Sequence, residues 1–302
     1  MNIKEPILEC DSRADSYTRK SVGDKPGLTF SITDQEFNLI RSFVYDSVGI
    51  NLTEQKRSLV VGRLQKKLRQ LGLKCFKDYY DYVSGDKTGQ ASVELADLIS
   101  TNYTYFNREK AHFEYFINTA LPETARRIMS RGKREIRVWC AAASSGEEPY
   151  LLAMLMREYF GEEYRLWDGG LLATDISKEA LLNAEAGVYK DEAVKPVPAD
   201  IRRKYFERTG NSEWKITVSV KKDVTFRRLN LMNRHFPFKK PFHIIFCRNV
   251  MIYFDQKTRD ALVRRFYDVT EPDGYLFIGH SETLNRSNMK YKYIKPAIYR
   301  KV

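Results

Sequence analysis

Apolar residues recur at helical spacing through residues 28–100, and this predicts an all-helical N-terminal domain. Thr33 followed by Glu36 is typical of a helix start, because each side chain can accept the backbone N–H of the other residue. A second helix is expected over residues 52–71, with Gly72 as its stop. Shorter helices are expected at residues 76–83 and 93–99, and the apolar stripe of the second helix comprises Val60, Leu64, Leu68 and Leu71.

From Glu135 onward the pattern changes to short apolar runs that alternate with amphipathic stretches. This alternation predicts an α/β domain built on a mostly parallel, doubly wound sheet. The alternating residues 291–302 predict a terminal antiparallel hairpin. The expected strands are 136–140, 171–175, 243–246 and 275–278, and the expected helices are 147–159, 177–186 and 256–269.

One stretch, within residues 204–226, breaks this alternation and predicts a small antiparallel β-subdomain. Its main strand is expected at residues 214–220, after a turn at 209–211. The predicted organisation is therefore a disordered leader at 1–27, a helical domain at 28–100, a linker with the first helices at 101–133, and an α/β domain at 134–302 that carries the β-subdomain insertion at about 187–222.

The 302-residue chain has a formal net charge of +12, which attracts nucleic acid, anionic lipid or an acidic protein. There is no run of 18 apolar residues, so no membrane insertion is expected, and the first 27 residues lack the apolar core of a signal peptide. Four scattered cysteines suit a reducing cytosol, which predicts a cytoplasmic protein. The four histidines show no metal-ligand spacing, so no metal site is predicted.

The second helix has an unusual charge pattern. Residues 56–77 contain eight basic side chains and no acidic one. A solvated helix face is the simple explanation, but such faces usually interleave both signs. The pattern therefore favours docking to an acidic partner, and the residues predicted to contact it are Lys56, Arg63, Lys66 and Lys67.

Open α/β sheets bind ligands at the carboxyl ends of their strands, near the point where strand order reverses. The first strand is followed by a small-residue loop, 141–146, which matches neither GxGxxG nor a P-loop, and then by Glu147 and Glu148. The second strand ends at Asp175, where a carboxylate can bind both ribose hydroxyls of a nucleoside. Each feature alone can be a turn or a helix cap. Together they favour an adenosine cofactor without a diphosphate, and S-adenosylmethionine fits because an acid can pair with its positive groups.

Six longer motifs follow one another along the chain, and together they are far more specific than any one alone. They are TNYTYFNRE at 101–109, WCAAASSGEEPY at 139–150, ATDI at 173–176, NL at 230–231, FCRNVMIYF at 246–254 and GHSE at 279–282. With them, the chain from about residue 30 to its end resembles the chemotaxis receptor methyltransferases of the CheR type. The resemblance implies an all-α N-terminal domain joined to a class I S-adenosylmethionine-dependent methyltransferase domain with a small antiparallel β-subdomain.

The resemblance also implies the site residues. Arg108 and Tyr253 are implied to orient the substrate carboxylate, and Glu148 is slightly favoured over Glu147 as the acid of the loop. The family usually has a second aromatic residue where this chain has Asn107, so packing beside Arg108 is in question. The implied cofactor contacts are Asn102, Thr104, Arg108, Glu147, Glu148, Asp175, Asn230, Leu231, Arg248 and Asn249.

The implied activity is methyl transfer from S-adenosylmethionine to glutamate side chains of methyl-accepting chemotaxis receptors, which yields glutamate methyl esters and S-adenosylhomocysteine. A free glutamate has a pKa of roughly 4.3, so it is already ionised at neutral pH and no general base is required. The implied partner is the acidic helical bundle of the receptor, and the enzyme is expected to act as a monomer.

Two alternative functions remain at this point. A nucleic-acid methyltransferase would explain the positive charge, but the chain has neither an Asn/Asp-Pro-Pro-Tyr/Phe motif nor a catalytic Pro-Cys, so no nucleic-acid partner is expected. A regulatory module that binds the cofactor without turnover is the other alternative, and Asn107 is the one residue that hints at it.

Overall fold

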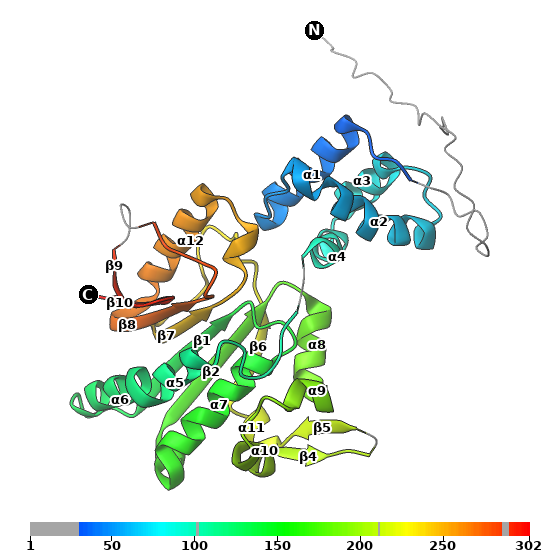
Figure 1. The fold of residues 1–302 in the computed structure, drawn as a ribbon. Coiled ribbons are helices and arrows are strands. Elements are labelled where there is room, and N and C mark those ends of the chain that lie inside the picture. The colour runs from blue at the N-terminus through cyan, green and yellow to red at the C-terminus, as the bar shows by residue number, and fades with distance from the viewer. Residues whose placement is uncertain (1–29, 101–102, 211, 286–289) are drawn as a thin grey trace. The chain divides into compact units, whose positions relative to one another are not determined.

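The computed structural model describes residues 30–100, 103–210, 212–285 and 290–302 (Figure 1). The contacts divide the chain into two units, with the boundary after residue 101. The predicted leader at residues 1–27 lies outside the described residues, and so does Asn102. Within the described segments, no helix has both the length and the apolar character that a bilayer crossing requires.

The N-terminal unit is helical, as its periodicity predicts. Its helices are α1 (Asp34–Val48), α2 (Arg57–Leu71), α3 (Phe76–Gly85) and α4 (Gln90–Ile99). The reciprocal cap of α1 is confirmed, because the Glu36 N–H donates to Thr33 Oγ1 at 3.2 Å and the Thr33 N–H donates to the Glu36 carboxylate at 2.9 Å. The stripe of α2 is buried at Val60, Leu64 and Leu68 but not at Leu71, which is 37% exposed in the last turn.

Three of the eight basic side chains at positions 56–77 form ion pairs within the fold. The ion pairs are Arg57 with Asp34 and Glu54, Lys67 with Glu94, and Lys77 with Asp81. Arg63 Nη1 lies within 3.0 Å of the last carbonyl oxygens of α4, at Leu98, Ile99 and Ser100, which have no partner inside their own helix. The missing acids are thus supplied by segments outside residues 56–77, and the one-sign pattern exaggerates the charge of this surface.

The second unit is built on a seven-stranded sheet of order β6-β2-β1-β7-β8-β10-β9. Its strands are β1 (Glu135–Ala141), β2 (Asp168–Asp175), β6 (Val224–Arg228), β7 (Phe242–Cys247), β8 (Thr270–Ile278), β9 (Tyr291–Lys295) and β10 (Ile298–Lys301). Neighbours from β6 to β8 are parallel, whereas β10 is antiparallel to both β8 and β9. The predicted doubly wound sheet and the terminal hairpin are confirmed.

Helices cover both faces of this sheet (Figure 1). The helices are α5 (Lys110–Tyr115), which continues through a π-helical turn at Phe116–Ala120 into α6 (Leu121–Met129), then α7 (Glu147–Phe160), α8 (Lys178–Ala186) and α12 (Gln256–Asp268). Val138 and Cys140 of β1 belong to the same buried cluster as residues of α5 to α8. Trp139 points to the opposite face, where it packs against Phe266 of α12 and donates to Thr174 Oγ1 at 2.9 Å. The alternation along β1 therefore places the two helical layers on opposite faces.

The small β-subdomain exists, but its predicted strand is partly wrong. It contains β3 (Val188–Lys190), α9 (Asp191–Val194), α10 (Ala199–Tyr205), β4 (Phe206–Arg208), β5 (Glu213–Ile216) and α11 (Val218–Lys221), with strand order β3-β5-β4. The strand expected over residues 214–220 ends at Ile216, and one helical turn follows. Val218 is 62% exposed and Val220 is fully buried, so an alternating pattern this short also fits a helical turn that buries one side chain.

The strand β6 is a second correction to the sequence prediction. The sequence prediction includes Phe226 in the stretch at 204–226 that breaks the alternation, but Phe226 lies in β6 of the large sheet, opposite Ala173 of β2. Only Val224 and Phe226 are buried in this short strand at the sheet edge. Two apolar residues separated by a threonine give too short a pattern to show whether a strand belongs to the small β-subdomain or to the edge of the large sheet.

His243 in β7 should make the protein sensitive to acid. Burial, together with Arg137 and Arg127, lowers the pKa of His243 to about 3 against the opposing attraction of Glu135. In the unfolded chain the His243 imidazole binds a proton near pH 6.5, whereas in the folded chain it stays neutral down to about pH 3. The free energy of unfolding therefore falls by about 1.4 kcal/mol per pH unit as the pH drops from 6.5 toward 3. We expect His243→Asn to be relatively more stable in this range, because its amide oxygen can still accept the Arg137 N–H that now donates to Nδ1 at 3.0 Å.

Urea unfolding at several pH values measures this effect. The difference between the two proteins should be constant above pH 7 and should shift in favour of the variant below pH 6. If the free energies of unfolding of wild type and His243→Asn differ by the same amount at every pH, His243 does not cause the acid sensitivity.

Candidate active site

The carboxyl ends of the parallel strands bring most of the predicted site residues to one edge of the sheet. The chain runs from β1 outward to β2 and β6, and then returns to the other side of β1 with β7 and β8. Strand order thus reverses between β1 and β7, which is where open α/β sheets bind ligands. Glu148 follows β1, Asp175 ends β2, Asn230 follows β6, and Arg248 with Asn249 follows β7.

The loop after β1 is held by Asp175. Its two carboxylate oxygens accept the backbone N–H groups of Ser144 at 2.8 Å and Ser177 at 2.9 Å. Ala142 and Ser144 both have positive φ angles, of 64° and 47°, which is strained for residues with a side chain. The Asp175 carboxylate therefore fixes the backbone of this loop at the end of β2.

Gly146 permits the close approach of this loop to α8 and the β-subdomain. Its φ is 96°, and an added Cβ would lie 2.9 Å from both Ala184 Cβ and Tyr189 Oη. We expect Gly146→Ala to destabilise the protein by about 1–3 kcal/mol and to weaken cofactor binding, because the loop must shift. Gly132→Ala is the matched control, since Gly132 also has a positive φ, of 67°, but nothing within 4 Å of the added Cβ.

Urea unfolding and the affinity for S-adenosylhomocysteine test this comparison. If Gly146→Ala and Gly132→Ala lose the same small amount of stability and cofactor affinity, the predicted collision of the Gly146 Cβ is wrong and only the backbone conformation matters.

The two adjacent acids at the start of α7 have different surroundings. Glu147 is 5% exposed and accepts the hydroxyl of Ser145, and burial raises its pKa. Glu148 pairs with the guanidinium of Arg248 and also accepts the thiol of Cys140 at 3.1 Å. Glu147 therefore stabilises the loop through Ser145, whereas Glu148 faces Arg248 at the end of β7. This contrast strengthens the preference for Glu148 as the cofactor acid.

Arg248 is the centre of a buried polar network. Its side chain is 3% exposed and pairs with Glu148 through Nη1 and with Glu109 through Nη2, which also donates to the Arg108 carbonyl. Burial alone lowers the pKa of Arg248, but the attraction of Glu148 and Glu109 outweighs it and raises that pKa. Asn249, with a φ of 58°, donates from its amide to Glu109 at 3.1 Å. The segment 108–109 is thereby tied to the ends of β1 and β7.

The remaining predicted residues lie around this network or near it in the chain. Arg108 is half-buried and donates from Nη1 to the Tyr103 carbonyl at 2.6 Å. Asn230 uses its Oδ1 to accept the Met232 N–H at 2.9 Å, which shapes the turn after β6, and Leu231 is 8% exposed. Tyr253 is half-buried in a 3₁₀ turn at Met251–Tyr253, and Thr104 is half-buried in the segment before α5.

Asn107 has a physical explanation. Its φ is 62°, in the left-handed region where asparagine is tolerated far better than an aromatic residue. Its amide also donates to the Pro196 carbonyl at 3.2 Å, which links this segment to the β-subdomain. Asparagine at position 107, in place of the family's second aromatic residue, therefore suits the local backbone.

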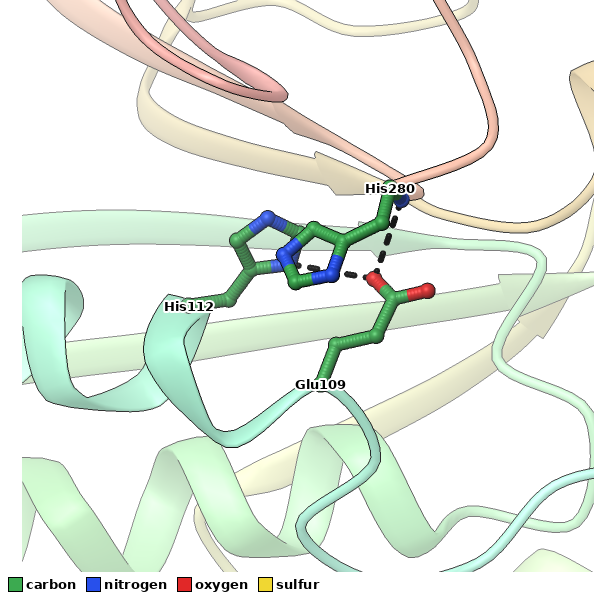
Figure 2. Close-up of side chains that lie close together, drawn as sticks. All are labelled: Glu109, His112 and His280. Atoms are coloured by element: carbon green, nitrogen blue, oxygen red, sulfur yellow. Dashed lines mark hydrogen bonds and ion pairs between the residues drawn. The ribbon is translucent and has the colours of Figure 1, made fainter.

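Sequence analysis missed a group of side chains beside Arg248. Glu109, His112 and His280 come together there, with one potential ligand atom of each within 4.8 Å of the others (Figure 2). Glu282 is a second missed residue; it is 3% exposed and accepts the backbone N–H groups of Gly279 at 2.6 Å and Asn249 at 3.2 Å. Only the Glu109 and His112 spacing along one helix end was visible in the sequence, because 168 residues separate His112 from His280.

Comparison with known proteins places this arrangement in a family. Residues 102–299 match the family model described as the CheR methyltransferase, SAM binding domain, and residues 35–100 match the CheR methyltransferase, all-alpha domain. The chain belongs to the CheR methyltransferase family. It is therefore an S-adenosylmethionine-dependent methyltransferase, and the resemblance inferred from the motifs is confirmed.

Curated relatives match over nearly their whole length. A chemotaxis protein methyltransferase of Borreliella burgdorferi is 41% identical over 92% of this chain and 98% of its own. A chemotaxis protein methyltransferase of Escherichia coli is 36% identical over 89% of this chain and 91% of its own. These matches span both structural units, so family membership extends to the helical domain as well as to the sheet.

Proposed function

We propose that this enzyme transfers a methyl group from S-adenosylmethionine to glutamate side chains of chemotaxis receptors. The observation that carries the proposal is a pair of carboxylates beside the small-residue loop at the strand-order reversal, with Arg108 in the adjoining segment. Glu148 lies at the start of α7, after the loop, and Asp175 ends β2. The names of the relatives support a protein substrate over a nucleic acid. We also propose that the enzyme acts in the cytoplasm.

The donor set suits S-adenosylmethionine chemically. Asp175 would bind the ribose hydroxyls from the end of β2, and Glu148 would face the positive methionine end. Among the described residues, Glu148 Oε1 accepts the thiol of Cys140, which is a weak donor that an ammonium group can displace. Asn102, Thr104, Arg108, Glu147, Asn230, Leu231, Arg248 and Asn249 complete the proposed contact set.

The side chains of this enzyme would contribute alignment and charge. The bound cofactor supplies an electrophilic methyl group on a sulfonium. Arg108 would hold one oxygen of the substrate carboxylate by a charge-assisted hydrogen bond, and Tyr253 would help to orient it. Alignment of this kind contributes on the order of 7–11 kcal/mol to catalysis. No proton has to be removed, because the glutamate is already ionised at neutral pH.

The experiment that tests the function uses cofactor labelled on the transferred methyl group. Incubation with receptor-containing membranes should give base-labile label on the receptor, released as methanol, and peptide mapping should place it on glutamates. Parallel incubation with cellular RNA should give none. Base-stable label on protein, label on RNA, or bound cofactor without transfer would contradict the proposal.

The helix α2 remains the proposed docking surface for the acidic receptor bundle, with Lys66 as its best test. Lys66 is exposed, whereas Arg63 and Lys67 also hold α4 in place. We expect Lys66→Glu to slow receptor methylation by roughly fivefold at low salt, and the deficit should shrink at high salt because exposed charges are screened. Lys87→Glu, an equally exposed change in the α3–α4 loop, is the control.

Initial rates of receptor methylation at two salt concentrations measure this effect. Equal losses in the two variants would mean that net charge, rather than the α2 surface, governs docking.

A further inference from the structure

Glu109, His112 and His280 form a compact group of nitrogen and oxygen donors outside the proposed catalytic pair. Glu109 is the N-cap residue of α5, His112 lies in the first turn of that helix, and His280 follows β8 (Figure 2). The two imidazole rings meet edge to face with centroids 4.4 Å apart, and His112 Nδ1 is 3.3 Å from Glu109 Oε2. Three side chains from two elements thus converge on one point.

His112 gives an independent sign that something binds here. Its side chain is 1% exposed, and neither ring nitrogen has a hydrogen-bond partner among the described residues, despite the nearby Glu109. An unpaired buried polar atom costs about 1–3 kcal/mol, so two on one ring require an explanation. Figure 2 shows the His112 ring facing His280 and the Glu109 carboxylate. A ligand that accepts a lone pair from imidazole would remove this cost at one of the two ring nitrogens.

We propose that Glu109, His112 and His280 bind a divalent cation of the zinc class. Two imidazoles and one carboxylate suit Zn²⁺ and its neighbours Co²⁺ and Ni²⁺, whereas Mg²⁺ and Ca²⁺ prefer oxygen ligands. Ligand atoms on one tetrahedral zinc lie about 3.4 Å apart, so the widest distance here, up to 4.8 Å, has to close by roughly 1–1.5 Å. His280 is exposed, and rotation of its side chain can provide that closure.

The local charge balance allows a cation despite the buried guanidinium. Arg248 is surrounded by two carboxylates, Glu109 and Glu148, so this group of three carries one net negative charge. Glu109 Oε2 is the shared atom: it accepts Arg248 at 3.0 Å and the His280 N–H at 3.2 Å. A cation on Oε2 competes directly with Arg248 for this oxygen.

This competition predicts coupling between the cation and the cofactor. Arg248 is tied to Glu148 and Asn249 is tied to Glu109, and both strand-end segments belong to the proposed cofactor contacts. When Glu109 binds the cation, its hydrogen bonds to Arg248 and Asn249 weaken, so Zn²⁺ should lower the affinity for S-adenosylhomocysteine. By thermodynamic reciprocity, S-adenosylhomocysteine should lower the affinity for Zn²⁺ by the same factor. The site would then act as an inhibitory metal site of the methyltransferase.

Metal binding to the full-length protein tests the proposal without any turnover. Chelator-treated protein should bind Zn²⁺ at this site in isothermal titration calorimetry, and Co²⁺ should produce visible d–d absorption without sulfur charge-transfer bands. We expect His280→Ala to weaken Zn²⁺ binding at least about tenfold and to abolish the Co²⁺ spectrum. Because His280 is exposed, this variant should fold even if a second variant, His112→Phe, does not.

His235→Ala is the matched control, because it removes an exposed histidine from a turn outside this group. It should leave both the Zn²⁺ affinity and the Co²⁺ spectrum unchanged. Zn²⁺ binding that is equally strong in wild type and His280→Ala, or that falls equally with His235→Ala, would overturn the site. A normal metal site in a protein that fails to methylate receptors would instead count against the proposed function alone.

Discussion

Arg108→Ala should lower the turnover number by roughly 10²–10³-fold while changing the affinity for S-adenosylhomocysteine much less. The reason is that Arg108 is proposed to hold the substrate carboxylate, whereas Glu148 and Asp175 hold the cofactor. The backbone carbonyl of Arg108 accepts a hydrogen bond from Arg248 Nη2, which ties this segment to the strand ends. The substitution removes the Arg108 guanidinium but retains this backbone hydrogen bond. Single-turnover methylation and calorimetric binding of S-adenosylhomocysteine measure the two quantities separately.

Two further variants sharpen this test. Arg108→Lys retains the charge but loses the planar fork, so its turnover should lie between those of wild type and Arg108→Ala. Arg131→Ala removes the same charge from the exposed turn after α6 and should behave as wild type. Near-normal methylation by Arg108→Ala would remove this residue from the mechanism, and an equal loss of cofactor affinity would mean that its main role is the proposed cofactor contact rather than the substrate carboxylate.

Arg248→Met should destabilise the protein by about 3–5 kcal/mol, the largest stability effect that we expect from one side chain. Methionine fills much of the same volume, but Glu109 and Glu148 then lose their common cation in surroundings where each carboxylate is at most 16% exposed. Cofactor affinity should fall as well, because Glu148 and the 108–109 segment lose their common anchor. Urea unfolding and S-adenosylhomocysteine binding measure the two effects.

Lys240→Met is the control for the type of interaction. Lys240 pairs with Glu135 at 2.8 Å, but its side chain is 64% exposed, so the loss should be below about 1 kcal/mol. Adding Glu148→Gln to Arg248→Met should recover part of the stability, since one uncompensated charge is removed. If Arg248→Met costs no more than Lys240→Met, the buried network does not stabilise the fold.

The fold was largely predictable because its signals are local. The reciprocal cap of Thr33 and Glu36, the buried stripe of α2 and the strand that ends at Asp175 all depend on residues a few positions apart. Prediction failed where the signal is short. Residues 218–221 form a helical turn instead of strand, and Phe226 joins the edge of the large sheet, because two or three apolar positions carry no decisive period.

The candidate site was predictable only in part. Asp175 and Glu148 could be inferred from their places after expected strands, and the longer motifs carried the remaining residues. The contacts that give these residues their roles could not be inferred in this way. Glu147 supports the loop while Glu148 meets Arg248, and nothing in two adjacent glutamates indicates which one faces the strand ends.

The sequence by itself determined most elements outside the β-subdomain and β6, the doubly wound order, and the family, since periodicity, caps and motifs are properties of neighbouring residues. Tertiary structure decided which charges remain free and which side chains meet. Three of the eight basic residues at positions 56–77, namely Arg57, Lys67 and Lys77, pair with acids outside that window. Glu109, His112, Arg248 and His280 converge from the start of α5 and from the ends of two strands. The physical reason is that charge pairing and ligand geometry depend on distance in space, which chain separation does not encode.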